Sequence, residues 1–390
     1  MGQQGKATIH DLESSGIIKE IIAADLFPTE ESLVGANAFL KAKGYNKTTT
    51  LRLNVANEKD LPGVIKKNEV NIVICMLPFG LAMTAAQAAL DAGVHFVSSN
   101  YTYDLAQLHE FAVRQNCIIL PEMGLDPGID LVLGRLVVDE LDVIHGLYSY
   151  GGGVPAPECA ATSPIKYKIS WVFDRVLDVY VRNAKMIKGG QLFSVPGDEL
   201  FYEENVHKIE FPGVGSVEAY PNGDAVRYVD LFGLDDQLKE MGRFALRWPG
   251  HSRFWKTMVS LGLLEERPIT VNGLEVSPRA FLSKCLTPRL QFDDDERDVA
   301  LLRVKAWGLK NNKKVQITYD VIDYRDLETG LFAMNRTVGF TSSIGAQMIL
   351  EGKIKQTGVL SPVRHVPPHE FIEQIKARGI RINYKIEEIG

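Results

Sequence analysis

The first 120 residues alternate short apolar runs with longer segments in which apolar residues recur at helical spacing. The short runs are typical of strands buried in a parallel sheet, and the longer segments of amphipathic helices. The predicted helices are Lys6 to Ser15, Thr29 to Lys43, Glu58 to Lys67, Leu81 to Gly93 and Tyr103 to Asn116. The predicted strands are Lys19 to Asp25, Thr49 to Val55, Val70 to Leu77, His95 to Ser99 and Cys117 to Leu120. This alternation indicates βαβ units and a Rossmann-type, doubly wound parallel sheet.

The periodicity changes after residue 130, where longer and more mixed strand patterns begin. Val299 to Trp307 and Lys314 to Tyr324 alternate in the manner of hairpin strands joined across Gly308 to Asn312. Towards the end, the pattern predicts two amphipathic helices and then an edge strand, which are Thr341 to Gly352, Phe371 to Arg378 and Ile380 to Ile386.

The stretch Leu120 to Asp130 lies at the change of pattern and carries the first candidate for chemistry. It follows a buried-strand pattern and turns at Asp126-Pro127-Gly128. A carboxylate at the carboxyl end of a parallel strand lies where α/β folds place ligands, so Asp126 is a candidate catalytic residue. The alternative is that Asp126 only caps a helix from Gly128 to Glu140, with Pro127 in its first turn.

The N-terminus contains part of a dinucleotide-binding fingerprint, Gly-x-Gly-x-x-Gly. Gly2 and Gly5 supply its second and third glycines, and Asp25 ends the next strand at the expected distance. The first glycine and the first strand are missing, so Lys19–Asp25 and Val70–Leu77 would lack the strand between them. We therefore expect the active protein to begin roughly 8–12 residues upstream, the length of such a strand and its lead-in. An ordinary N-terminal helix is the alternative.

Asp25 also bears on the choice of cofactor. An acid at this position accepts hydrogen bonds from the ribose hydroxyls of NAD and repels the 2′-phosphate of NADP. The residues that follow it, Leu26 to Glu30, include no arginine or lysine to receive that phosphate. The sequence thus favours NAD over NADP.

Composition narrows the class of protein further. The net charge of −6 and the lack of a basic run argue against nucleic acid as a partner, and no apolar stretch is long enough to span a membrane. Four scattered cysteines and the absence of Cys or His pairs at ligand spacing predict no disulfide framework and no metal. The acidic run Asp293 to Glu296 is expected to be a solvated loop. A cytoplasmic protein is the default.

Four further segments resemble one family. They are Tyr148-Ser-Tyr-Gly-Gly-Gly-Val-Pro-Ala-Pro-Glu158, Pro164-Ile-Lys-Tyr-Lys-Ile-Ser-Trp171, Arg243-Phe-Ala-Leu-Arg-Trp-Pro-Gly-His251 and Ala333-Met-Asn-Arg-Thr-Val-Gly-Phe340. Together with Leu120–Asp130 the chain resembles the saccharopine dehydrogenase family, in particular saccharopine reductases and lysine 6-dehydrogenases. The resemblance implies a dinucleotide-binding domain at 1–127, an inserted α/β substrate and dimerisation domain with a mixed sheet at 128–340, and a return to the first domain at 341–390. It also implies a homodimer.

The resemblance also implies roles for individual residues. Oxidation of a C–N bond needs a hydride acceptor and a base, and Asp126 is the best candidate base. Tyr101 is the second catalytic candidate, and Asn100, Leu77 and Pro78 join the predicted cofactor-binding residues. Tyr167 and Trp171 are predicted to line the substrate pocket. Arg227 and Arg247 are predicted to bind the substrate carboxylate, and His251 is a candidate second proton carrier. Each of these has a packing or ion-pair role as its alternative.

One segment departs from the saccharopine reductase pattern. Tyr220-Pro-Asn-Gly-Asp-Ala225 has Gly223 where those enzymes carry an arginine, and Ala225 where they carry a serine. Gly-Asp-Ala-Val-Arg227 instead resembles a segment of lysine 6-dehydrogenases. The amino-acid substrate therefore stays open. Two other readings are a cofactor-poor relative that binds an amino acid without turnover, and a carboxynorspermidine-type reductase.

Overall fold

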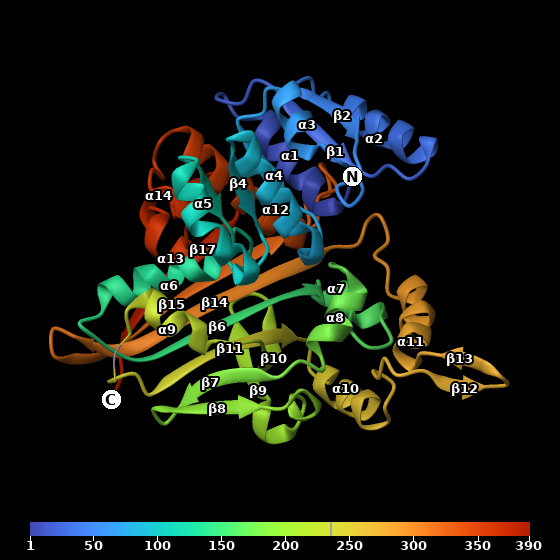
Figure 1. Ribbon diagram of the computed structural model, residues 1–390. Coiled ribbons are helices and arrows are strands. Elements are labelled where there is room, and N and C mark those ends of the chain that lie inside the picture. The colour runs from blue at the N-terminus through green and yellow to red at the C-terminus, as the bar shows by residue number, and fades with distance from the viewer. Residues whose placement is uncertain (235) are drawn as a thin grey trace. The chain divides into compact units, whose positions relative to one another are not determined.

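The computed structural model describes residues 1–234 and 236–390, which form two compact units. The first unit consists of Met1–Arg135 and Asn335–Ile380, and the second of Leu136–Met334 and Arg381–Gly390. Leu136–Met334 is thus inserted into the sequence of the first unit (Figure 1). Arg381–Gly390, which the sequence analysis expected to return to the first domain, belongs to the second unit.

The first unit contains parallel strands that alternate with helices, as the apolar pattern predicts. Its strands are β1 Ile21–Asp25, β2 Thr48–Arg52, β3 Ile72–Cys75, β4 His95–Ser98, β5 Ile118–Leu120 and β16 Gly358–Val359. They form two separate sheets, β1-β2 and β16-β5-β4-β3, in which the paired strands run parallel. Within the described residues β1 pairs only with β2, and β3 pairs only with β4. The sequence analysis expected a missing strand between β1 and β3, and these two strands are not hydrogen-bonded to each other.

The helices of the first unit begin and end close to the predicted positions in most cases. They are α1 Gln3–Glu13, α2 Glu30–Ala42, α3 Leu61–Lys67, α4 Phe79–Ala92, α5 His109–Arg114, α6 Ile129–Glu140, α12 Ala333–Leu350, α13 Pro362–His365 and α14 Pro368–Ala377. Residues 136–140 of α6 and residues 333–334 of α12 belong to the second unit. The predicted helix from Tyr103 is instead a 3-10 helix, η1 (Tyr103–Leu108), followed by α5. Its apolar residues Leu105 and Leu108 are three apart, a spacing that a 3-10 turn also satisfies.

Helix α12 begins eight residues before its predicted start. The buried carboxylate of Asp298 accepts hydrogen bonds from the backbone N–H groups of Ala333 (2.8 Å) and Met334 (3.1 Å). These are the donors that the first turn of a helix leaves unsatisfied. Because the cap comes from a residue 35 positions away, the local sequence carries no signal for it.

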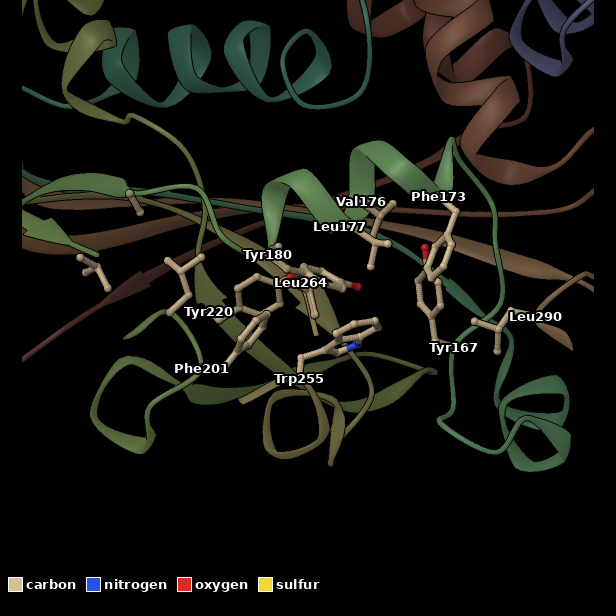
Figure 2. Close-up of a cluster of buried hydrophobic side chains, with 14 residues drawn as sticks. Tyr167, Phe173, Val176, Leu177, Tyr180, Phe201, Tyr220, Trp255, Leu264 and Leu290 are labelled. Carbon is tan, nitrogen blue, oxygen red and sulfur yellow. The ribbon is translucent and has the colours of Figure 1, made fainter. Parts of the chain in front are cut away.

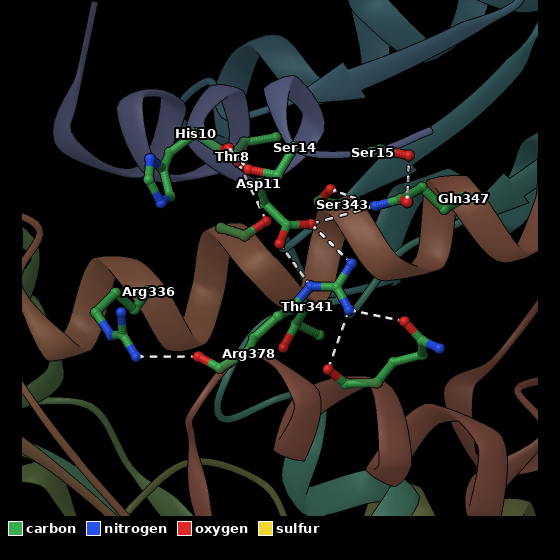
Figure 3. A network of polar contacts seen from close by, with 12 residues as sticks. Thr8, His10, Asp11, Ser14, Ser15, Arg336, Thr341, Ser343, Gln347 and Arg378 are labelled. Atoms are coloured by element: carbon green, nitrogen blue, oxygen red, sulfur yellow. Dashed lines mark hydrogen bonds and ion pairs between the residues drawn. The ribbon is translucent and has the colours of Figure 1, made fainter. Parts of the chain in front are cut away.

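The C-terminal helices pack against α1 within the first unit. Gly339 of α12 lies so close to α1 that a Cβ atom at this position would be 2.8 Å from Ala7 Cβ and 2.9 Å from Gln4 O. Arg378, at the end of α14, binds the Asp11 carboxylate of α1 with Nε at 2.5 Å and Nη2 at 3.0 Å (Figure 3). Gln347 of α12 also donates to Asp11, at 3.2 Å. A single buried carboxylate thus connects three helices.

We predict that replacing Arg378 by methionine destabilises the protein strongly. The pair is mostly buried, with 7% of the Asp11 side chain exposed, and the loss of one partner leaves the other charge in a dry environment. Breaking such a pair costs about 3 kcal/mol. Chemical denaturation would measure the change, with Lys313→Ala as the control because Lys313 pairs with Glu388 on the surface. Equal unfolding midpoints for R378M and the unaltered protein would contradict the prediction.

The second unit is built on a mixed sheet of nine strands (Figure 1). Its strands are β6 Val143–Pro155, β7 Ala184–Lys188, β8 Gln191–Val195, β9 His207–Phe211, β10 Gly215–Pro221, β11 Glu240–Arg247, β14 Asp298–Lys310, β15 Lys313–Tyr324 and β17 Arg381–Glu388. The main path runs β17-β15-β14-β6-β11-β10-β9, with β7 on β11 and β8 on β7. The β6–β11 ladder is parallel and its neighbours are antiparallel. The predicted hairpin is β14–β15 and the predicted edge strand is β17, so both are confirmed.

Besides four 3-10 turns, the remaining described elements of the second unit are five short α-helices and a separate hairpin. They are α7 Pro157–Thr162, α8 Phe173–Val179, α9 Val229–Phe232, α10 His251–Ser260, α11 Pro278–Leu286, β12 Ile269–Val271 and β13 Leu274–Val276. Side chains alternate between the faces of a strand, so β11 serves two cores. Phe244 and Leu246 belong to one core, whereas Ala245 belongs to the other with Tyr220 and residues of α8 and α10 (Figure 2).

Candidate functional site

The carboxyl ends of β3, β4 and β5 bring together the predicted cofactor-binding residues of the first unit. Asn100, just after β4, donates from Nδ2 to the carbonyl oxygen of Leu77, just after β3, at 3.2 Å. The Asn100 carbonyl accepts the backbone N–H of Glu122, beyond β5, at 2.9 Å. Pro78 is the N-cap of α4. The three strand ends are therefore tied into one edge, where parallel α/β sheets bind ligands.

Tyr101 forms part of an aromatic group at this edge. Its ring lies 5.2 Å from that of Tyr103, and Tyr103 lies 5.6 Å from Phe79 at the start of α4. Phe79 and Tyr103 are 43% and 48% exposed, so this group offers an apolar surface rather than a core. A flat nicotinamide ring can stack on such a surface.

Asp126 lies in a turn that holds it in a fixed position. The N–H of Gly124 donates to the carbonyl of Pro127 at 2.9 Å, and the peptide bond between Asp126 and Pro127 is cis. Gly128 has φ +146°, and a Cβ atom there would lie 2.0 Å from the carbonyl oxygen of Gly124. Glycine is therefore required at 128.

The helix that Asp126 was expected to cap begins one residue later than predicted. Helix α6 begins at Ile129, so neither Asp126 nor Pro127 occupies a capping or first-turn position, because the turn at Gly128 intervenes. From Cys117 to Gly134, all of which the structure describes, Asp126 is the one residue that is not buried. The residue is half-buried and its Oδ1 atom is buried, so the carboxylate lies at the boundary of the core rather than free in solvent.

Glu122 is a residue that the sequence analysis missed. It is 1% exposed and adopts φ +62°, which is unusual for a non-glycine residue. Its Oε1 accepts the backbone N–H of Thr102 at 3.2 Å, so it holds the turn that carries Tyr101. The signal was an acid two positions after a buried strand, in the same stretch as Asp126.

The N-terminus of α1 and the end of β1 supply the other predicted cofactor contacts. Gly2 is the N-cap of α1 and Gly5 lies in its first turn. A Cβ atom on either would meet nothing within 4 Å, so space is open at the positively polarised end of this helix, where a pyrophosphate binds well. Asp25 ends β1 and accepts the N–H of Leu26 at 2.7 Å. The other oxygen of Asp25, Oδ2, pairs with the N-terminal amino group of Met1 at 3.3 Å. The residues predicted to contact the adenosine half of a dinucleotide thus lie close together, with a cation beside the carboxylate.

In the second unit, three of the five predicted substrate residues lie in one aromatic cluster. The Arg247 guanidinium carbon is 5.4 Å from the centre of the Tyr167 ring, and its Nε lies 3.5 Å from the hydroxyl of Tyr180. His251 lies 5.8 Å from the Tyr167 ring, centre to centre. Tyr167 and His251 are buried and Arg247 is half-buried.

Arg247 lacks a counter-ion in the part of the chain that the structure describes. Its hydrogen bonds go to Tyr180 and to its neighbouring carbonyl, Leu246 O, at 2.7 Å. A half-buried cation without a carboxylate is costly unless a ligand supplies the negative charge. The planar guanidinium binds a carboxylate with two parallel hydrogen bonds.

The other two predicted substrate residues lie apart from this cluster. Trp171 is 42% exposed, so it is not a buried pocket wall. The Arg227 guanidinium lies 5.3 Å from the ring of Tyr228, whose ring also contacts Arg243 at 4.8 Å. Arg227 therefore belongs to a second arginine–tyrosine group.

The acidic run at 293–296 is only partly a solvated loop. Asp293, Asp294 and Asp295 are exposed, but Glu296 forms an ion pair with the buried Lys168 at 2.5 Å. Across residues 1–234 and 236–390, three or more potential metal ligands do not gather at any point. In the same residues no helix is long and apolar enough to span a membrane.

Comparison with known proteins decides the family. The model of the saccharopine dehydrogenase NADP-binding domain matches residues 1–120, and that of the saccharopine dehydrogenase C-terminal domain matches residues 124–380. The chain belongs to the saccharopine dehydrogenase family. The resemblance drawn from the sequence is thereby confirmed.

Relatives in this family include proteins of different lengths. Alpha-aminoadipic semialdehyde synthase from Rattus norvegicus is 27% identical over 86% of this chain but only 42% of its own length. The chain spans less than half of this and similar mammalian and plant relatives. The NADP(+)-dependent, L-glutamate-forming saccharopine dehydrogenase of Schizosaccharomyces pombe is 25% identical, with 91% of this chain and 92% of that protein covered.

A solved structure of the family supports the fold. The apo saccharopine dehydrogenase (L-Glu forming) from Saccharomyces cerevisiae has a TM-score of 0.84 at 23% identity, over 99% of this chain and 98% of that chain. The predicted fold class, a Rossmann-type parallel α/β region with an inserted mixed-sheet domain, is confirmed.

Proposed function

We propose that this chain is an NAD(P)-dependent oxidoreductase that acts on a C–N bond of an amino acid. Arg247 carries the proposal, because a half-buried guanidinium without a protein carboxylate suits a substrate that brings its own. The three joined strand ends and the open N-terminus of α1 support the binding of a dinucleotide. The named activities of the fungal relatives agree with this reading.

The proposed reaction is the oxidation of a secondary amine. The C–H bond next to nitrogen gives a hydride to the nicotinamide, which is the chemistry that the cofactor supplies when bound. Asp126 accepts the amine proton and releases it to solvent, and then accepts a proton from the water that attacks the carbon of the imine. It returns this second proton to the nitrogen of the carbinolamine. The C–N bond then breaks to give a carbonyl compound and a primary amine. Tyr101 is proposed to border the reacting ring.

The substrate is proposed to be an amine with several carboxylates, of the saccharopine type. Gly223 replaces the arginine of saccharopine reductases, yet another guanidinium lies beside it: Nη2 of Arg182 would be 3.4 Å from a Cβ atom at residue 223. Arg182 also donates to Asn222 Oδ1 at 3.3 Å. A second cation therefore remains available for a second carboxylate.

A panel of amines tests the proposed function. Reduction of NAD and NADP would be followed at 340 nm with saccharopine, lysine and carboxynorspermidine as substrates. We expect the highest kcat/KM with saccharopine. Preference for lysine would assign the chain to the lysine 6-dehydrogenase type, and preference for carboxynorspermidine to the polyamine type. Quenching or enhancement of NADH fluorescence on binding, without turnover of any amine, would instead indicate a non-catalytic relative.

NAD is expected to bind more tightly than NADP, although the fungal relatives are named for NADP. Asp25 ends β1 and would face the ribose, where a carboxylate repels the 2′-phosphate. The nearby Arg52 is paired with Glu30 at 2.7 Å. Fluorescence titration of both reduced cofactors measures the preference, and Asp25→Ser should narrow it. Tighter binding of NADPH to the unaltered protein would contradict the role of Asp25.

We also propose an oligomeric state and a cellular location. A homodimer formed through the second unit and a cytoplasmic location follow from the family resemblance and from the composition. Light scattering of the purified protein tests the first, and fractionation of the source cells the second.

A further inference from the structure

Two ring nitrogens on one face of α10 lack hydrogen-bond partners among the described residues. They are Nε2 of His251 and Nε1 of Trp255, in side chains that are 3% and 0% exposed. Residues four apart lie above one another on a helix, so both rings point to the same side. A buried donor left unpaired costs about 1–3 kcal/mol, and native proteins seldom tolerate two together. This pair indicates a missing partner.

Both rings belong to the cluster that contains Arg247. The centre of the Tyr180 ring lies 4.7 Å from that of Trp255 and 5.4 Å from that of His251. Arg247 Nε lies 3.5 Å from the Tyr180 hydroxyl. Figure 2 shows Trp255 beside Tyr180 and Tyr220 in this core. The two nitrogens and the guanidinium thus gather around one tyrosine.

We propose that His251 Nε2 and Trp255 Nε1 donate hydrogen bonds to the substrate carboxylate that pairs with Arg247. This inference rests on the proposed function, from which it takes that carboxylate. All three protein groups are then donors, and a carboxylate only accepts. The NH2 group of a carboxamide is itself a donor, so it would face these protein donors without forming a hydrogen bond. The arrangement therefore selects an acid over its amide, and His251 and Trp255 determine that specificity.

The state of His251 agrees with a neutral donor. Burial and the adjacent Arg247 guanidinium hold the pKa of His251 well below its usual range, so the ring is uncharged near neutral pH. An uncharged ring donates from one nitrogen and adds no second buried charge.

The start of α10 does not compete for the same ligand. The carboxylate of Glu218 accepts the N–H groups of Gly250 at 2.7 Å and Ser252 at 3.0 Å. The Glu218 carboxylate therefore already occupies the helix N-terminus. Its bonds to Gly250 and Ser252 also fix the residues on either side of His251. The proposed ligand contacts come from the side chains of α10 alone.

The test compares an acid with its amide in four variants. His251→Phe and Trp255→Phe remove the nitrogens but keep aromatic rings, while His207→Phe and Trp307→Phe make the same changes at partly buried sites outside this cluster. Calorimetric titration of the full chain with glutarate and glutaramide gives the dissociation constants. We expect the unaltered protein and both controls to bind glutarate and not glutaramide. We expect H251F and W255F to bind glutarate at least about tenfold more weakly, since a hydrogen bond to a charged group contributes that much.

Two results would overturn the proposal. If H251F and W255F both bind glutarate with affinities within twofold of the unaltered protein, the two rings serve only in packing. Equal affinity for glutaramide in the unaltered protein would remove the selectivity. Failure of the proposed function can be told apart from failure of this proposal. An absence of turnover with every amine would count against the proposed function, but the glutarate affinities are measured independently of turnover.

A measurement on the unaltered protein covers the case in which a variant does not fold. The chain has four tryptophans and therefore four indole N–H signals in an NMR spectrum. Trp171→Phe, Trp248→Phe and Trp307→Phe assign three of them, which leaves that of Trp255. Glutarate should shift the Trp255 signal downfield as its N–H gains an anionic acceptor, and an unchanged signal at saturating glutarate would overturn the proposal.

Discussion

Replacement of Asp126 by asparagine is expected to lower kcat by about 10²- to 10⁴-fold, the usual loss when a positioned acid–base group is removed. NAD affinity should change little, because Asp126 lies in the turn beyond β5 and not at the joined residues Leu77 and Asn100. The amide keeps the shape of the side chain, so the turn at Gly128 should be preserved. Steady-state rates and NADH fluorescence titration measure the two effects.

The matched control for Asp126 is Asp104→Asn. Asp104 is an exposed carboxylate in η1, close in sequence to Tyr101, and its loss should leave kcat unchanged. Turnover of D126N within a few-fold of the unaltered enzyme would show that Asp126 has only a structural role.

Replacement of Arg247 by methionine is expected to raise KM for saccharopine by about 10- to 100-fold, which corresponds to one charged hydrogen-bonding contact. The contact exists in the ground state and in the transition state, so kcat should fall much less than kcat/KM. Methionine keeps the length and removes the charge.

Arg227→Met is the comparison for Arg247, because the sequence proposed both arginines for the carboxylate. Arg227 packs on Tyr228 rather than in the cluster of Tyr167 and Tyr180, so a smaller rise in KM is expected. An unchanged KM in R247M together with a raised KM in R227M would reverse the two assignments.

Local sequence patterns predicted the first unit well because its strands and helices bury their own apolar residues. The strand predicted at His95–Ser99 is β4, His95–Ser98, and helix α2 has its cap at Thr29, the residue at which the prediction began. The helix starting at Ala333 was placed too late because its cap, Asp298, is distant in sequence.

The second unit was harder to predict. Strand β6 runs for 13 residues through Gly151-Gly-Gly153, a sequence that suggests a loop. The glycines serve close packing there: a Cβ atom at Gly152 would lie 2.6 Å from Leu246 O on the next strand. Such a contact becomes visible only once the sheet is formed.

The candidate site was predicted in part for the same physical reason. Asp126 and Asn100 follow strands that the apolar pattern identifies, so their common edge could be predicted. Trp255 was missed because an aromatic residue four positions after His251 has the spacing of a core residue. Only the lack of a hydrogen-bond partner for its indole N–H indicates a role in ligand binding. Trp171 was predicted from resemblance to line the pocket or to lie in the core; its side chain is 42% exposed, so the core role is excluded and the pocket role stays a prediction.

The most direct test of the proposed function is a single turnover observed at 340 nm. Enzyme that carries one bound NAD per active site, without free NAD, is mixed with excess saccharopine, and absorbance is followed on the millisecond to second scale. We predict the formation of one reduced nicotinamide per active site in the unaltered enzyme, and none in D126N on the same time scale. Bound cofactor and bound saccharopine without any absorbance change would contradict the proposed oxidation.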